Sequence, residues 1–247
     1  MNILVTNDDG YFAPGLKALA KALHDAGHNV TVMAPHQENS GMSHSITFLE
    51  ALKVSPVTIE GLDVMAYSVS GTPADCVRAA VNILNRKFDF CFSGCNNGYN
   101  AGMDVLYSGT VSAAVEANLF NINAIAVSTE FKKTHMHYDT SARVALEVFD
   151  KIKDTLEPVQ VVNINVPSME YEKLSGIRAA KLGGVIQDHF DAEPQGDGFN
   201  IHLMRRDTQT YEKGTDRYLL QSGYATVTPL VYDFNNPALL HRLRDNL

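Results

Sequence analysis

Two adjacent carboxylates, Asp8 and Asp9, follow an apolar run at the start of the chain, within the sequence Thr-Asn-Asp-Asp-Gly at residues 6–10. Like charges this close raise each other's pKa, and a bound divalent cation reverses that effect. Two later segments also end apolar runs in small oxygen-bearing residues: Asn-Ser-Gly at 39–41 and Ser-Gly-Cys-Asn at 93–96. Carboxylate, hydroxyl and amide oxygens suit magnesium, manganese or calcium better than zinc. Together the three segments predict a metal site and metal-assisted chemistry.

Another segment is suited to holding an anion. Residues 108–110 (Ser-Gly-Thr) stand directly before a predicted helix, where free backbone N–H groups, two hydroxyls and the positive end of the helix dipole favour a phosphate group. Gly94, Gly98 and Gly102 leave backbone N–H groups open to a ligand. His44 is the candidate acid or base. We expect substrate or phosphate contacts from five residues of these segments: Asn7, Asn100, Ser108, Gly109 and Thr110.

Each of these residues also has a purely structural interpretation. Asp8 and Asp9 could cap the following helix, and Ser40 is ordinary in a serine-rich turn. Asn96 could serve a left-handed turn position. A lone loop histidine such as His44 is more often solvated than catalytic. The metal hypothesis therefore depends on several segments meeting at one place.

Other reactive residue types are better explained without chemistry. Three residues resemble a metal cluster by their spacing: His135, His137 and Asp139. We interpret them as an exposed polar loop. Ser108 is disfavoured as an acyl-transfer nucleophile, because its segment lacks the Gly-x-Ser-x-Gly turn. Cys91 and Cys95 are interpreted as core thiols, because no second cysteine pair completes a zinc site.

Composition limits the class of protein. The 247 residues, of which 45% are hydrophobic, are enough for one large α/β domain with a sizeable core. The formal net charge is -8 and no basic stripe is present, which argues against duplex nucleic acid as a partner. Three cysteines argue against a disulfide framework. The sequence shows no secretory signal and no apolar run long enough to span a membrane, so we expect a cytoplasmic protein.

Strands and helices alternate along the first part of the chain. Apolar runs predict strands at 2–6, 29–34, 63–69, 88–92, 124–128 and 159–166. Helical periodicity and capping residues predict helices around 16–23, from 73 to about 85, and over 111–119 and 140–155. Such alternation favours a doubly wound, mostly parallel, Rossmann-like α/β sheet. Ligands of these sheets bind beyond the carboxyl ends of the strands, so the polar segments above are expected on one edge.

The alternation ends after residue 167. Glycines punctuate β-like segments at 198–204 and 225–229, and a short helix is expected at 237–247. We predict a β-hairpin excursion that packs on another subunit, because a lone hairpin cannot bury both faces. We therefore divide the chain into a metal- and phosphate-binding core at 1–167 and an extension at 168–247 that belongs to the same domain.

Read together, the motifs resemble the SurE family of metal-dependent nucleotidases. The resemblance spans residues 1 to about 230 and rests on five ordered motifs, at 3–16, 34–47, 71–77, 93–111 and 215–230. It implies Asp8, Asp9, Ser40 and Asn96 as the ligands of one Mg²⁺ or Mn²⁺ ion per subunit. It further implies hydrolysis of nucleoside monophosphates to nucleoside and phosphate, as by a 5′-nucleotidase. Members assemble as dimers or tetramers by exchanging C-terminal elements, which agrees with the predicted hairpin.

The chain departs from the family pattern at three places. Residues 36–39 read His-Gln-Glu-Asn where an Asp-x-x-Arg stretch is usual, which removes a positive charge near the site. Cys95 replaces the usual hydrophobic residue after Ser-Gly, and Arg217 displaces the common aromatic after Thr-Asp. These departures leave the implied metal ligands in place and bear on substrate preference. In the expected mechanism Asp8 and Asp9 hold the metal, and one of them accepts a proton from the attacking water.

Two other functions share parts of this pattern. A phosphorelay receiver also carries an acidic pair after its first strand and binds magnesium, but it needs a phosphorylatable aspartate at the end of a central strand. Residues 93–96 contain none. Residues 27–32 resemble the opening of a nucleotide-sugar transferase half, a fold that requires a second Rossmann-like domain. The receiver-like module is the remaining alternative to the phosphomonoesterase.

Overall fold

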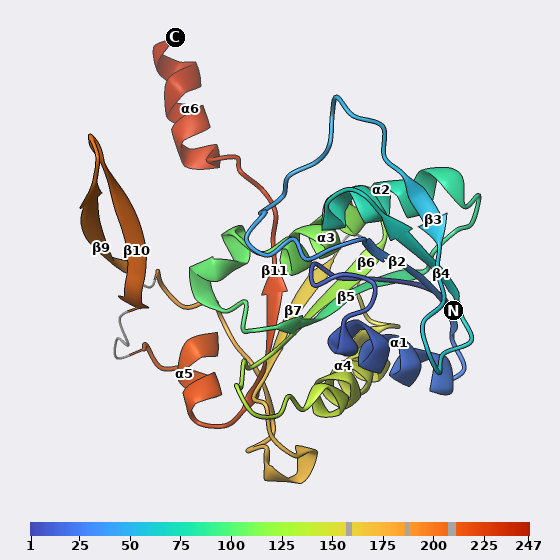
Figure 1. Ribbon diagram of the computed structural model, residues 1–247. Helices are drawn as coiled ribbons and strands as arrows, with labels where there is room; N and C mark the ends of the chain where they lie inside the picture. Colours follow the sequence, from blue (N-terminus) through green and yellow to red (C-terminus); the bar gives the residue numbers. More distant parts are fainter. Residues whose placement is uncertain (157–159, 186–187, 207–210) are drawn as a thin grey trace.

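A nine-stranded sheet runs through the centre of the described residues, which are 1–156, 160–185, 188–206 and 211–247 of the computed structural model (Figure 1). From one edge to the other its strands are β3 (Val54–Pro56), β4 (Met65–Val69), β2 (Asn29–Pro35), β1 (Asn2–Thr6), β5 (Phe90–Asn97), β6 (Asn123–Thr129), β7 (Val161–Val166), β11 (Ala225–Leu230) and β8 (Ile177–Ala179). Only the β3–β4 and β11–β7 pairs of this sheet are antiparallel. The predicted doubly wound, mostly parallel α/β fold is confirmed.

Helices cover both faces of the sheet. The described helices are α1 (Pro14–Asp25), α2 (Pro73–Ile83), α3 (Gly109–Leu119), α4 (Tyr138–Ile152), α5 (Asp216–Gln221), α6 (Pro237–Asn246) and the 3₁₀ turns η1 (Gly102–Leu106) and η2 (Tyr171–Lys173). Helices α1 and α4 pack together on one face, and α2 and α3 pack together on the other (Figure 1). Two apolar cores result, one on each side of the sheet.

Strand β1 shows how the sequence supplies both cores. Successive side chains of a strand point to opposite faces, so a strand buried on both sides must be apolar throughout. Ile3 and Val5 lie in the core beneath α1 and α4, whereas Leu4 lies in the core beneath α2 and α3. All three are fully buried, and each stabilises the fold by about 1.5–3 kcal/mol relative to an exposed position.

The starts of α2 and α3 are fixed by local hydrogen bonds. The Thr72 hydroxyl accepts a bond from the Asp75 N–H at 3.2 Å, and the Asp75 carboxylate accepts one from the Thr72 N–H at 3.0 Å. This reciprocal pair is a capping box. Ser108 caps α3, because its Oγ accepts a bond from the Val111 N–H at 3.1 Å. The predicted cap at Thr72 is confirmed.

Several element boundaries differ from the sequence expectation. Strand β5 continues to Asn97, five residues past the predicted end at 92, because β6 pairs with it again after a shift in register between Ser93 and Asn96. Helix α4 begins and ends slightly earlier than the predicted 140–155. The six-residue helix α5, capped by Thr215, was not predicted, since it is too short for apolar periodicity to reveal.

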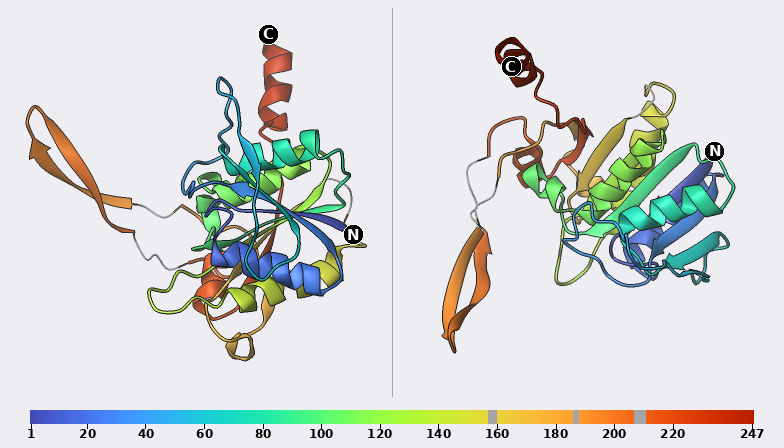
Figure 2. Two further views of the ribbon diagram at one scale, coloured as in Figure 1. Left: turned by 45° about the vertical axis from the view of Figure 1, so that its right-hand side comes forward. Right: turned by 90° about the horizontal axis from the view of Figure 1, so that it is seen from above.

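The predicted β-hairpin excursion is confirmed as the antiparallel pair β9 (Asp188–Gln195) and β10 (Gly198–Arg206). Figure 2 shows the hairpin and helix α6 both projecting away from the sheet and its helices. Large apolar side chains on the hairpin are exposed: Phe190, Phe199, Ile201, Leu203 and Met204. No helix among the described residues combines the length and the apolarity needed to cross a bilayer. The three cysteines are buried and free.

Candidate metal and phosphate site

A cavity of about 260 Å³ lies at the edge of the sheet where β1 and β5 end. Its lining includes Asp8, Ser40, Asn96, Asn100, Asp104 and Ser108. These residues come from the segment after β1, the loop after β2, strand β5 with its following loop, and the cap of α3. The structure thus brings three of the four expected metal-binding residues and two of the expected phosphate contacts to one cavity.

Asp8 is nearly enclosed, with 3% of its surface exposed. Burial raises the pKa of its carboxyl group, and a hydrogen bond donated by the Thr110 hydroxyl to Asp8 Oδ1 opposes that rise. Gly109 packs directly against this side chain, since a Cβ at Gly109 would lie 2.9 Å from the Asp8 Cβ. The first turn of α3 therefore positions Asp8.

Asp9 is less enclosed and sits beside the cavity. Burial, followed by the charge of Asp8, raises the pKa of Asp9 to about 7, although the Asn97 N–H donates a hydrogen bond to Asp9 Oδ2 at 3.1 Å. Among the described residues, no lysine or arginine forms an ion pair with either aspartate. Two desolvated carboxylates without a cationic partner are a costly arrangement that a divalent cation stabilises.

Ser40 and Asn96 supply neutral oxygens to the cavity. The Ser40 Oγ donates a hydrogen bond to Glu38 Oε1 at 2.8 Å. The residue before it, Asn39, donates its N–H to the Asp8 carbonyl at 2.7 Å, which attaches the loop to the segment that follows β1. Asn96 Nδ2 donates to the Gly98 carbonyl at 2.8 Å, a bond that does not use the amide oxygen Oδ1. Both side chains can offer an oxygen to a cation.

The donor set fits a hard divalent cation. In the part of the chain that the structure describes, no three His, Cys, Asp or Glu side chains cluster so as to hold a metal, so any site here depends on hydroxyl and amide oxygens as well. Two carboxylates with neutral oxygens and water suit Mg²⁺ or Mn²⁺, which keep several water ligands. His135 and His137 do not line this cavity. Their rings pack edge to face on each other, with the ring centroids 4.6 Å apart.

The residues expected to bind phosphate divide into two groups. Ser108 and Asn100 line the cavity. Thr110 is fully buried and its hydroxyl is donated to Asp8, while Gly109 lies against the same carboxylate. Asn7 is also fully buried, and its Nδ2 donates to the Gly10 carbonyl at 2.9 Å. The structure therefore puts Thr110 and Asn7 behind the cavity wall and not on its surface.

Sequence reasoning missed a charged pair at the cavity. Asp104 of η1 lines the cavity, and its Oδ2 forms an ion pair with the Arg217 Nη2 at 2.9 Å. Arg217 also donates to the Ala101 carbonyl at 2.5 Å, and the neighbouring Asp216 accepts the Gly102 N–H at 2.6 Å. Arg217 was noted only as a departure from the family pattern, and nothing in the sequence signals its partner more than 100 residues earlier.

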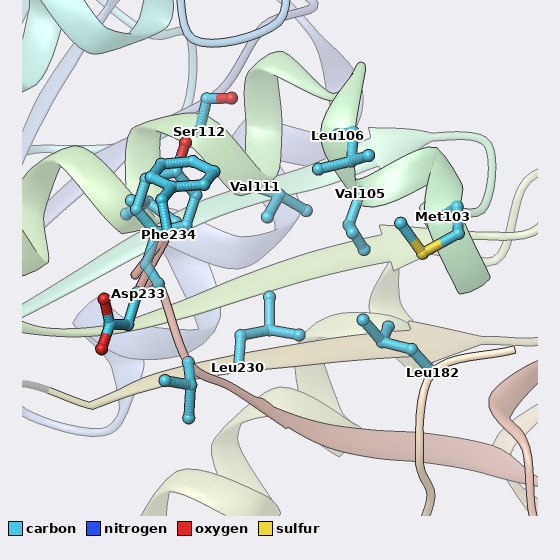
Figure 3. A pocket seen from close by; sticks show the side chains of 12 residues that line it. Met103, Val105, Leu106, Val111, Ser112, Leu182, Leu230, Asp233 and Phe234 are labelled. Atoms are coloured by element: carbon cyan, nitrogen blue, oxygen red, sulfur yellow. The ribbon is translucent and has the colours of Figure 1, made fainter. Parts of the chain in front are cut away.

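A second cavity lies on the apolar side of η1. It measures about 160 Å³ and is enclosed by η1, α3 and the chain that follows β11. Figure 3 shows Val105, Leu106 and Val111 facing Leu230 and Phe234 across it. Its lining is predominantly apolar, and Ser112 and Asp233 are among its polar residues. Residues of η1 thus line two cavities of different character.

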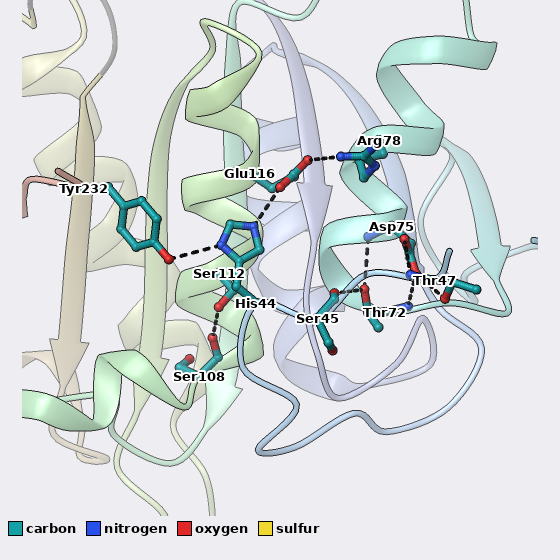
Figure 4. A network of polar contacts seen from close by, with 10 residues as sticks. All are labelled: His44, Ser45, Thr47, Thr72, Asp75, Arg78, Ser108, Ser112, Glu116 and Tyr232. Carbon is teal, nitrogen blue, oxygen red and sulfur yellow. Dashed lines mark hydrogen bonds and ion pairs between the residues drawn. The ribbon is translucent and has the colours of Figure 1, made fainter. Parts of the chain in front are cut away.

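His44 does not line the metal and phosphate cavity. Its ring points toward helix α3, where Nε2 lies 2.7 Å from Glu116 Oε2 (Figure 4). Glu116 is 3% exposed and also accepts a hydrogen bond from Arg78 at 3.1 Å. His44 is therefore engaged in a polar network beside the cavity.

Comparison with known proteins identifies close relatives of the chain. A family model described as "Survival protein SurE" matches residues 3–188. A protein of Clostridium beijerinckii named 5′-nucleotidase SurE is 40% identical over 97% of this chain and 96% of its own length. A Clostridium botulinum (strain 657 / Type Ba4) protein of the same name is 41% identical over 96% and 95%. The crystal structure of SurE protein from Aquifex aeolicus superposes with a TM-score of 0.86 at 33% identity, covering 100% of this chain and 99% of that one.

Proposed function

The chain belongs to the SurE family, and on that premise we propose that it is a metal-dependent 5′-nucleotidase, which hydrolyses nucleoside monophosphates to nucleoside and phosphate. The relatives that carry this name match nearly the whole chain. The observation that carries the mechanism is the pair of desolvated carboxylates, Asp8 in the wall of the cavity and Asp9 beside it, which have no cationic partner among the described residues; the cavity also presents neutral oxygen donors.

We propose that Asp8, Asp9, Ser40 and Asn96 bind one Mg²⁺ or Mn²⁺ ion per subunit. When bound, such an ion polarises phosphoryl oxygens and lowers the pKa of a water molecule. The Ser108 segment holds the phosphate of the substrate at the start of α3, and Asn100, which also lines the cavity, contributes a second contact. One of the two aspartates accepts the proton of the attacking water. Thr110 keeps Asp8 oriented for this role.

The receiver-like alternative has no support. A receiver forms a phosphoaspartate on a residue at the end of a central strand. Strand β5 carries no aspartate, and its buried end holds Ser93, Cys95 and Asn96. The relatives found by comparison are named as nucleotidases. Incubation with a small phosphodonor would label a receiver covalently, and we expect no label here.

A phosphate-release assay tests the proposed function. Purified chain is given nucleoside monophosphates and a generic phosphomonoester, with Mn²⁺ or Mg²⁺ and then with excess chelator. We expect turnover that chelator abolishes and added metal restores. The variant Asp9→Asn keeps the shape but loses one charge of the metal site, so most of the turnover should be lost. Asp25→Asn, an exposed aspartate on α1, serves as the matched control. Full turnover of Asp9→Asn in saturating Mn²⁺ would refute the ligand assignment.

We further propose that the C-terminal extension joins subunits into a dimer or tetramer. The hairpin exposes Phe199 and Ile201, and α6 exposes Leu239 and Leu243, a pattern that marks a contact surface. Replacing Phe199 and Ile201 by serine should lower the mass measured by light scattering. The three free cysteines agree with a cytoplasmic location, which we also propose.

A further inference from the structure

The loop that carries Ser40 is fastened to the protein on both sides of that residue. Before it, the Asn39 N–H donates to the Asp8 carbonyl at 2.7 Å. After it, Ser43 donates its N–H to the Tyr107 carbonyl at 3.1 Å and its hydroxyl to the Leu106 carbonyl at 2.7 Å. Among the described residues, the Ser40 hydroxyl bonds only within the loop, to Glu38. The position of its hydroxyl at the cavity therefore depends on these flanking attachments.

His44 extends the second attachment into helix α3. Figure 4 shows its ring directed at Glu116, with Arg78 of α2 on the other carboxylate oxygen. Burial alone would raise the pKa of Glu116, but the hydrogen bonds from His44 and Arg78 hold it below its ordinary value. Glu116 is therefore an ionised and buried acceptor, bonded from two other elements, to which a loop residue can be anchored.

The same helix also contacts Asp8, another residue that lines the cavity. Thr110, in the first turn of α3, donates to the Asp8 carboxylate, and Glu116 lies six residues further along the helix. Asp8 and the Ser40 loop come from different strands, yet both are attached to α3. A change at the His44–Glu116 contact is expected to move Ser40 relative to Asp8.

Both ring nitrogens of His44 have neighbours. Nε2 lies 2.7 Å from Glu116, and Nδ1 lies 3.5 Å from the hydroxyl of Tyr232, which stands in the chain after β11. In this arrangement Nε2 is placed to donate a hydrogen bond to the Glu116 carboxylate. Since the ring is directed at Glu116 (Figure 4) and His44 does not line the metal and phosphate cavity, His44 is poorly placed to transfer a proton to or from a substrate.

We propose that His44 is a positioning residue, which holds the Ser40 hydroxyl in the metal site by anchoring its loop to Glu116. The proposal rests on the proposed function of the cavity and replaces the acid–base role that the sequence suggested for this histidine. The proposed role depends on the hydrogen bond that His44 donates to Glu116 and not on the charge of the ring. A side chain that donates one hydrogen bond at the same place should therefore substitute for it.

The test compares three variants of the full chain. His44→Ala removes the anchor and leaves Glu116 paired with Arg78, His44→Gln keeps an N–H donor, and Phe48→Ser changes an exposed residue of the same loop as the matched control. The affinity for Mn²⁺ alone is measured from the electron paramagnetic resonance signal of the free ion. Thermal unfolding checks the fold, and kcat is measured against pH at saturating Mn²⁺.

For a positioning role we expect His44→Ala to weaken Mn²⁺ binding about 10- to 100-fold, as removal of groups that orient metal ligands does. Its kcat at saturating Mn²⁺ should stay within about threefold of the wild type and keep the same pH profile, with affinity largely restored in His44→Gln. Unchanged Mn²⁺ affinity, or a 10²- to 10⁴-fold loss of kcat with a lost limb of the pH profile, would overturn the proposal. Mn²⁺ affinity is measured without substrate. The test of His44 can therefore still be interpreted if the protein shows no nucleotidase activity.

Discussion

The hydrogen bond from Thr110 to Asp8 gives the sharpest test of how the site is built. Sequence alone suggested that Thr110 binds phosphate, whereas its hydroxyl is fully buried and donated to the Asp8 carboxylate. The substitution Thr110→Val removes the hydroxyl and keeps the shape of the side chain. The two interpretations then predict losses in different quantities, metal affinity in one case and substrate affinity in the other.

The size of the effect follows from the charge of the acceptor. A hydrogen bond to a charged group is worth about 1.5–3 kcal/mol, and each 1.4 kcal/mol is tenfold in an equilibrium constant. Because the bond is also present without metal, only the part of this energy that depends on the charge and orientation of Asp8 enters the metal affinity; we therefore expect Thr110→Val to weaken Mn²⁺ binding about 10- to 100-fold, as removal of groups that orient metal ligands does. Loss of the bond also raises the pKa of Asp8 further, because the Thr110 hydroxyl opposes the rise caused by burial. The added competition from protons acts in the same direction.

Titration calorimetry with Mn²⁺ measures this loss directly, and Thr110→Ser is the matched control. Serine keeps the hydroxyl but loses a buried methyl group, so it should cost about 0.8 kcal/mol of unfolding free energy and leave Mn²⁺ affinity within about threefold. Equal losses of affinity in both variants would assign the effect to packing. Unchanged Mn²⁺ affinity in Thr110→Val with a raised KM for the nucleotide would show that Thr110 contacts phosphate after all.

Three further predictions concern the same carboxylates. Because the pKa of Asp9 is raised to about 7, Mn²⁺ must displace a proton from Asp9 below that pH. The affinity for Mn²⁺ should therefore fall about tenfold for each pH unit below 7. A Kd for Mn²⁺ that is independent of pH would contradict this. The same shift lies above the ordinary value, so metal-free protein should lose stability as pH rises from about 4 to 7, which urea unfolding measures. Gly109→Ala places a Cβ 2.9 Å from the Asp8 Cβ and should weaken Mn²⁺ binding, whereas Gly184→Ala, with no atom within 4 Å of its Cβ, should not.

Much of the fold could be predicted because local patterns decide it. Strand β1 and the Thr72 cap of α2 are each determined by residues within a few positions of one another in the sequence. The end of β5 could not be predicted, since Gly94 and Gly98 suggest a break, while pairing with β6 carries the strand on to Asn97. That pairing joins segments about 30 residues apart, and no local signal encodes it.

The same distinction applies to the cavity. Asp8, Ser40 and Asn96 all follow or end strands of one parallel sheet, and topology alone predicts that such residues share an edge. The role of Thr110 depends on how closely α3 approaches β1, which is a matter of tertiary packing across 102 residues. The sequence can therefore predict which residues lie at a sheet edge. It cannot predict whether the Thr110 hydroxyl faces the cavity or the Asp8 carboxylate, because that depends on how α3 packs.

The charges around the cavity explain why metal and substrate should bind together. Arg217 pairs with Asp104, whereas Asp8 and Asp9, with Glu38 nearby, have no lysine or arginine partner among the described residues. A phosphate monoester is itself anionic, so the metal-free cavity repels it as the chain's net charge of -8 does at longer range. On the proposed assignment, a divalent cation held by the two aspartates would balance their charge and would attract the oxygens of a phosphate group. Metal binding would then raise the affinity for the substrate, and by thermodynamic linkage the substrate would raise the affinity for the metal by the same factor.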